Sequence, residues 1–142
     1  MKEKRFEILG ILIVTVSILI LFSFFGYNSN EDPGISPNVK VENPMGILGV
    51  WLSYFFIKLG LGYSAFFIPL LSTVWGIWFF MHKDFEAIVR PSLYGLLGVL
   101  LSSISLGYLQ IVYYGFDNLS FPLSGVTGGL IAILFYDFLG NI

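Results

Sequence analysis

The stretch from residue 46 to residue 80 constrains this chain most, because Lys58 is its one charged residue. A single straight helix over it would measure roughly 54 Å, nearly twice the roughly 30 Å hydrocarbon thickness of a bilayer. The stretch must therefore break, and the segment KLGLG at 58–62 supplies the break through Gly60 and Gly62. We predict a short interfacial or re-entrant helix over 46–59 and a membrane crossing over 61–81, in which neighbouring helices make a kink at Pro69 tolerable.

The composition is compatible only with a membrane protein. Hydrophobic residues make up 56% of the 142 residues and charged residues 11%, whereas a soluble domain carries about 25% charged residues. The absence of cysteine excludes disulfides and thiolate metal sites. The sequence has no basic patch, so we do not expect this segment to bind nucleic acid.

Three further crossings are expected on the same grounds. Residues 8–25 are uncharged, exceed the core of a signal peptide and are followed by no small-x-small cleavage site. We therefore predict an uncleaved first crossing over 8–26. Further crossings are predicted over 92–113 and 123–142, with outer loops at 27–45 and 114–122 and a cytoplasmic loop at 82–91. The expected fold class is an all-α, four-transmembrane-helix bundle plus the short 46–59 helix, in one domain.

The basic residues predict an orientation. Lysine and arginine near helix ends favour the cytoplasmic side. Both termini and the 82–91 loop are therefore predicted to be cytoplasmic, since that side would hold Lys2, Lys4, Arg5, Lys83 and Arg90, against Lys40 and Lys58 outside.

Signatures of catalysis are lacking, and neither a catalytic residue nor a cofactor is predicted. His82 is the one histidine, in a polar loop with no second metal ligand spaced to join it. The apolar segments contain only Lys58 and Asp137 as intramembrane charges. Such charges are functional suspects by default. Asp137, however, falls near the expected cytoplasmic end of the fourth crossing, and Lys58 has a long stem that reaches outward beside the glycine break.

Small residues indicate where helices approach closely, because van der Waals contact drives helix packing in lipid. Gly95, Gly98, Ser102 and Ser105 line one face of the third crossing, and Gly125, Gly129 and Ala132 line one face of the fourth. The contacts lie either within one chain or between chains. Gly46-x-x-Gly49 and Gly125-x-x-Gly128 are also 79 residues apart, which suggests a diverged repeat.

The order of these motifs resembles the four-helix N-terminal membrane domain of the FtsK/SpoIIIE DNA translocases. An outer loop ends in asparagine and glycine, and Gly46, Gly49, Gly60, Ala65 and Pro69 match the family's following pattern. Its clustered glycines at the start of the last helix correspond to Gly125, Gly128 and Gly129, and its closing glycine to Gly140.

The resemblance implies a non-enzymatic membrane anchor for a hexameric, ATP-driven DNA pump that these 142 residues do not include. It also implies a location in the bacterial inner membrane at the division septum, a homo-oligomer, and contacts with cell-division membrane proteins. The alternative from another class is a subunit of a small four-helix transporter or channel.

Overall fold

The computed structural model describes residues 2–31, 33–34, 41–115 and 121–139. All regular secondary structure in this part is helical and no strand occurs in it, which confirms the all-α membrane class. The elements are α1 (Lys2–Phe25), α2 (Gly46–Ser53), the π-helical η1 (Tyr54–Leu61), the 3₁₀-helical η2 (Gly62–Phe66), α3 (Phe67–Phe80), α4 (Phe85–Tyr114) and α5 (Gly125–Leu139).

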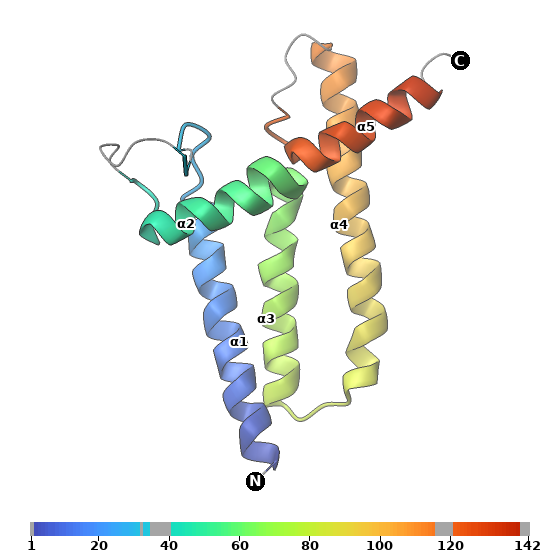
Figure 1. Cartoon of the computed structure of the whole chain (residues 1–142). Helices are drawn as coiled ribbons and strands as arrows, with labels where there is room; N and C mark the ends of the chain where they lie inside the picture. The colour runs from blue at the N-terminus through green and yellow to red at the C-terminus, as the bar shows by residue number, and fades with distance from the viewer. Residues whose placement is uncertain (1, 32, 35–40, 116–120, 140–142) are drawn as a thin grey trace.

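Three helices, α1, α3 and α4, run side by side and are called the upright helices (Figure 1). The described residues contain three helical stretches long and apolar enough to cross a membrane, Lys4–Phe25, Gly46–Phe80 and Phe85–Tyr114. The first and third expected crossings, 8–26 and 92–113, fall in α1 and α4. The loop expected over 82–91 is shorter, because α4 begins at Phe85 and passes through Pro91, which removes only one backbone hydrogen bond.

The helical stretch Gly46–Phe80 is broken at the predicted place. Gly60 has a non-helical ψ of −118°, and Gly62 has a φ of +64° that glycine adopts without a steric penalty. As a result α2 and η1 lie across the upright helices, while α3 runs antiparallel to α1 beside it (Figure 1). Pro69 is the third residue of α3, where backbone N–H groups lack intrahelical partners, so the expected kink is not needed there.

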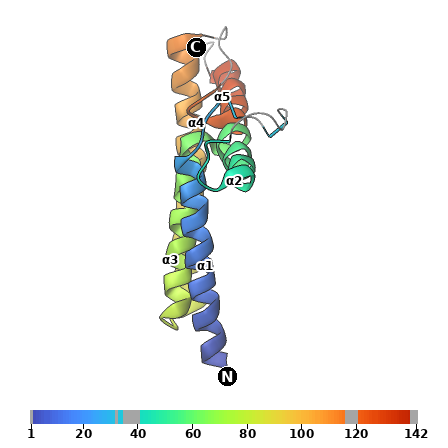
Figure 2. The same cartoon turned by 90° about the vertical axis from the view of Figure 1, so that its left-hand side faces the viewer.

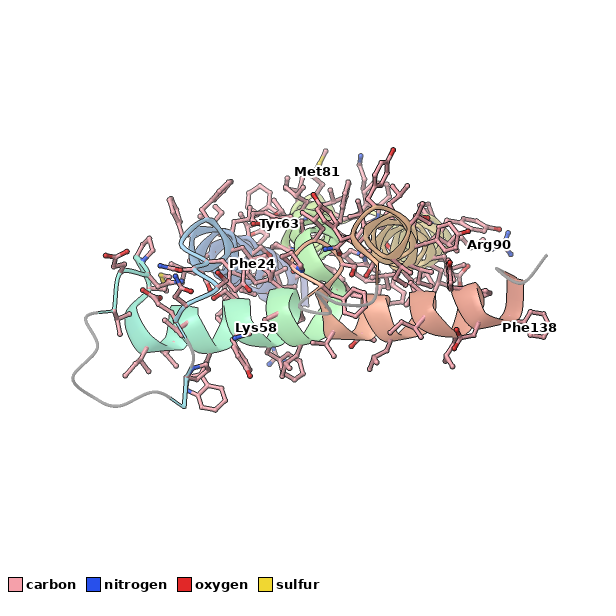
Figure 3. The ribbon with its side chains drawn as sticks, turned by 90° about the horizontal axis from the view of Figure 1, so that it is seen from above. Phe24, Lys58, Tyr63, Met81, Arg90 and Phe138 are labelled. Atoms are coloured by element: carbon pink, nitrogen blue, oxygen red, sulfur yellow. The ribbon has the colours of Figure 1, made fainter. Side chains whose placement is uncertain are left out.

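The last helix differs from the expected fourth crossing over 123–142. With 15 residues, α5 is about 22 Å long and also lies across the upright helices (Figure 1). Seen along the upright helices, α2, η1 and α5 form one line beside the row of α1, α3 and α4 (Figure 3). We call this line the crossbar.

The crossbar lies toward the end of the row opposite the N-terminus (Figures 1 and 2). Asp137, near the described end of α5, is therefore not beside the N-terminal end of α1. The fourth crossing was expected to end on that side of the membrane, with Asp137 close to it. Many side chains on the crossbar are apolar and exposed, among them Leu48, Trp51, Phe55, Leu134 and Phe138. An exposed apolar surface of this kind suits contact with lipid.

The N-terminal end of the row gathers the basic residues. The ring of Phe6 in α1 stacks on Phe79 in α3 at 6.2 Å. His82 Nε2 lies 3.7 Å from Glu7 Oε1. The start of α1 and the turn before α4 are thus neighbours, as the grouping of Lys4, Arg5, Lys83 and Arg90 requires. Which side of the membrane this end faces stays a prediction.

Two small cores attach the crossbar to the upright helices. Phe24, Ile57 and Ala65 join α1 to η1 and η2. Ile111, Phe121 and Ala132 join α4 to α5. Both cores belong to the crossbar end of the bundle, so this end is the most extensively packed part of the described structure.

Candidate functional site: the glycine junction of the crossbar

The two arms of the crossbar meet at glycines. Gly125, the first residue of α5, has a φ of +70°, and a Cβ there would lie 2.6 Å from both the Gly62 nitrogen and the Ile57 oxygen. A Cβ on Gly62 would overlap the carbonyl of Leu123. Glycine is thus required at both positions for two reasons, a left-handed backbone and direct backbone contact.

Hydrogen bonds cross this junction. The Thr127 hydroxyl donates to the Leu59 carbonyl at 2.7 Å, and the Tyr63 N–H donates to the Leu123 carbonyl at 3.0 Å. The carboxyl end of η1 thereby faces the amino end of α5. This head-to-tail order is favourable, because the negative end of one helix dipole meets the positive end of the next.

The predicted small-residue face of α5 packs on α4. A Cβ on Gly107 would lie 2.9 Å from the Ala132 Cβ and 3.0 Å from the Gly128 oxygen, and a Cβ on Gly128 would overlap the Ser103 hydroxyl. A Cβ on Gly129 would likewise overlap the Phe121 ring. The contact lies within one chain, which was one of the two arrangements left open.

The small face predicted on α4 is not the one that packs on α5. A Cβ added on Gly98 would meet no atom of another element within 4 Å, and the nearest to one on Gly95 is Leu71 Cδ1 at 4.0 Å. Ser102 reaches η2, where its hydroxyl lies 2.9 Å from the Ser64 hydroxyl. Ser105 is exposed and bonds the carbonyl of Leu101 in its own helix. Ser103 and Gly107, one residue further round the helix, make the close contact instead.

The glycines that join α1 to α3 are not among the packing residues predicted from the sequence. A Cβ on Gly10 would lie 2.6 Å from the Gly76 oxygen, and one on Gly76 would lie 2.8 Å from the Gly10 oxygen. A signal was present, since Ser17 follows Gly10 by one heptad on the same face and is fully buried. Ser72-x-x-x-Gly76 is likewise a small-residue pair.

The start of the crossbar is fixed by Asn43, which is 5% exposed. Its amide nitrogen donates to the carbonyls of Ser23 at 2.9 Å and Gly26 at 3.2 Å, and its oxygen accepts from the Met45 N–H at 3.0 Å. The Ser23 hydroxyl donates to the Gly49 carbonyl at 2.7 Å. Gly46 then turns the chain with a φ of +61° and open space around it.

The two predicted intramembrane charges are not brought together. Lys58 lies on η1 with its Nζ 5.1 Å from the centre of the Tyr54 ring (Figure 3 labels Lys58). Asp137 lies on the other arm of the crossbar and is exposed. Among the described residues no three His, Cys, Asp or Glu side chains are grouped to hold a metal ion.

Long apolar helices, a glycine-broken crossbar and packing through small residues define a multi-pass, all-α membrane domain. The family described as the 4TM region of DNA translocase FtsK/SpoIIIE matches residues 3–142. The chain therefore belongs to this family, and the resemblance read from its glycine pattern is confirmed. No curated protein and no solved structure matches the chain.

Proposed function

We propose that this domain anchors a cytoplasmic, ATP-driven DNA-translocating motor in the bacterial inner membrane at the division septum. The observation that carries the proposal is the family match over residues 3–142. On this proposal the domain itself catalyses nothing, assembles as a homo-oligomer and contacts cell-division membrane proteins.

The distribution of charge supports the proposed orientation. The end of the row that holds Lys4, Arg5 and Lys83 would face the cytoplasm, because positive residues are retained on that side during insertion. On the proposal α5 crosses the membrane in the assembled protein, so that the chain beyond it also reaches the cytoplasm. In the structure α5 is held crosswise by its contacts with α4 and η1. The proposal therefore requires that these contacts open in the assembled protein and that the chain turns at Gly125, whose φ of +70° glycine adopts without a steric penalty.

The topology is directly testable, because a chain without cysteine permits single-cysteine labelling without background. Cysteines placed at Asn141, Ser29 and Lys83 would be probed in intact cells with a membrane-impermeant maleimide. We expect Ser29→Cys to react from outside, and Lys83→Cys and Asn141→Cys to react only after the membrane is opened. Labelling of Asn141→Cys from outside would refute anchoring of a cytoplasmic motor through the C-terminal end.

Localisation tests the septal part of the proposal. A fluorescent fusion of residues 1–142 should gather at midcell in dividing cells, whereas a fusion carrying only residues 1–31 should spread over the whole membrane. Uniform distribution of both fusions would contradict recruitment by division proteins while leaving membrane anchoring intact.

A further inference from the structure

A cleft of about 450 Å³ opens at the crossbar end of the bundle, at the point where α1 ends. Four separate parts of the chain form its walls: the end of α1 and the turn after it, the segment before α2, η2, and the segment before α5. The residues that matter for its chemistry are Phe25, Tyr27, Asn28, Glu42, Tyr63 and Pro122.

Aromatic rings and a carboxylate dominate the walls of the cleft. Tyr27 is half-buried, and its burial, together with the neighbouring Tyr63 and Tyr54 phenols, raises the pKa of its hydroxyl above the ordinary value. Tyr27 therefore presents a neutral, electron-rich ring, the Tyr63 ring lines the same cleft, and Glu42 is exposed. None of the described residues lining the cleft is basic.

A second carboxylate stands directly behind this wall. Glu31 Oε1 accepts the Glu42 N–H at 2.8 Å, and the Glu31 N–H donates to the Asn28 carbonyl at 3.0 Å. Glu31 Oε2 is buried and has no hydrogen-bond partner in the described structure. A buried acceptor without a donor is costly, and Glu31 together with Glu42 gives this side of the cleft two carboxyl groups.

We propose that this cleft binds the ammonium group of an amine-bearing phospholipid headgroup. An ammonium group lies favourably over aromatic rings such as those of Tyr27 and Tyr63, and its N–H donors pair with a carboxylate such as that of Glu42. The depth of the cleft fits a lipid, because it begins at Phe25, the last residue of the apolar stretch Lys4–Phe25. Phe25 and Tyr63, exposed by 74% and 49%, would contact the glycerol and upper acyl region of the same lipid. The proposed lipid site is independent of what the domain anchors.

The test is lipid retention by the full chain. Protein in nanodiscs of equal parts phosphatidylethanolamine, phosphatidylcholine and phosphatidylglycerol, with matched acyl chains, would be released and weighed by native mass spectrometry. We expect phosphatidylethanolamine to be retained most and phosphatidylglycerol least, because only ethanolamine combines positive charge with N–H donors. Equal retention of the three lipids would overturn the proposal.

Matched variants locate the site. Glu42→Gln and Tyr63→Ala should each lower phosphatidylethanolamine retention by about three- to tenfold, as expected for loss of one ion pair or one cation–ring contact. Tyr63→Phe, which keeps the ring, and Glu86→Gln, at the opposite end of the bundle, should retain the lipid fully. Unchanged circular dichroism would show that the variants fold. Undiminished retention by both Glu42→Gln and Tyr63→Ala would refute the site.

A soluble competitor separates the lipid from a free amine. O-Phosphoethanolamine at millimolar concentration should leave the retained lipid in place, because the free molecule lacks the contacts with Phe25 and Tyr63. Displacement of the lipid at micromolar concentration would overturn a lipid as the ligand and indicate a soluble amine.

Discussion

Replacing Gly125 with alanine should separate the two arms of the crossbar. The left-handed φ of +70° alone costs a side chain about 1–2 kcal/mol. The added Cβ would also lie 2.6 Å from the Gly62 nitrogen and the Ile57 oxygen, so α5 would have to move away from η1. That movement breaks the bonds from Thr127 to Leu59 and from Tyr63 to Leu123, each a net contribution of about 0.5–1.5 kcal/mol. We expect a total loss of about 2–5 kcal/mol of unfolding free energy.

Two further glycines provide matched controls. Gly46 has a similar φ of +61° but nothing within 4 Å of an added Cβ, so Gly46→Ala should cost the conformational part alone, about 1–2 kcal/mol. Gly98 lies within α4 with open space around it, so Gly98→Ala should stabilise the helix by up to about 1 kcal/mol. The difference between Gly125→Ala and Gly46→Ala therefore isolates the contact between the arms.

Unfolding in mixed micelles, driven by increasing SDS and followed by tryptophan fluorescence, measures these differences. Trp51 reports on the crossbar, while Trp75 and Trp78 report on α3. A loss for Gly125→Ala no greater than that for Gly46→Ala would refute the conclusion that the arms meet backbone to backbone.

Three further outcomes are expected. Gly76→Ala should lower stability by about 1–3 kcal/mol in the same SDS titration, because its Cβ would lie 2.6 Å from Val14 Cγ2, whereas Gly95→Ala should be neutral or stabilising. Since the pKa of Tyr27 is raised in the folded chain, its stabilising contribution is complete below pH 10 and is lost as the pH rises through the folded pKa. Alkaline unfolding should accordingly begin at a higher pH in Tyr27→Phe. Asp137→Asn should leave ion flux into proteoliposomes unchanged, because Asp137 is exposed and apart from Lys58, and abolished flux would favour a transporter instead.

The break near Gly60 was predictable because it follows from length alone. A charge-poor stretch too long for one crossing must turn, and Gly60 and Gly62 are the residues in it that lower the conformational free-energy cost of the turn. The first and third crossings follow equally directly from the lengths of their apolar segments. These predictions depend only on the chain and the bilayer, so no knowledge of neighbouring helices was needed.

The position of the helix contacts was less predictable. Spacing shows that Gly95 and Gly98 share a small face, but it does not show which helix reaches that face. α4 has 30 residues, longer than a membrane crossing needs, and the contacts that bring it close to α5, at Ser103 and Gly107, lie in its C-terminal half. The crosswise direction of α5 depends on the same contact together with the backbone of Gly125, and neither is visible in its apolar composition.

The suggested repeat gains a structural basis from the two arms of the crossbar. Gly46 and Gly125, 79 residues apart, both begin an arm with a positive φ. Each arm is also held by a serine of the preceding upright helix, since Ser23 bonds the Gly49 carbonyl and Ser103 bonds the Ser124 carbonyl.

Each half of the chain thus contains an upright helix followed by a crosswise arm, and α3 connects the first unit to the second. In lipid the apolar side chains gain little from leaving one apolar neighbour for another. The glycine backbones and serine hydroxyls must then determine how the units fit together. The two arms differ chiefly at their ends. The first arm ends at Gly60 and Gly62, where the second arm packs against it, whereas the second arm has no such neighbour at its described end.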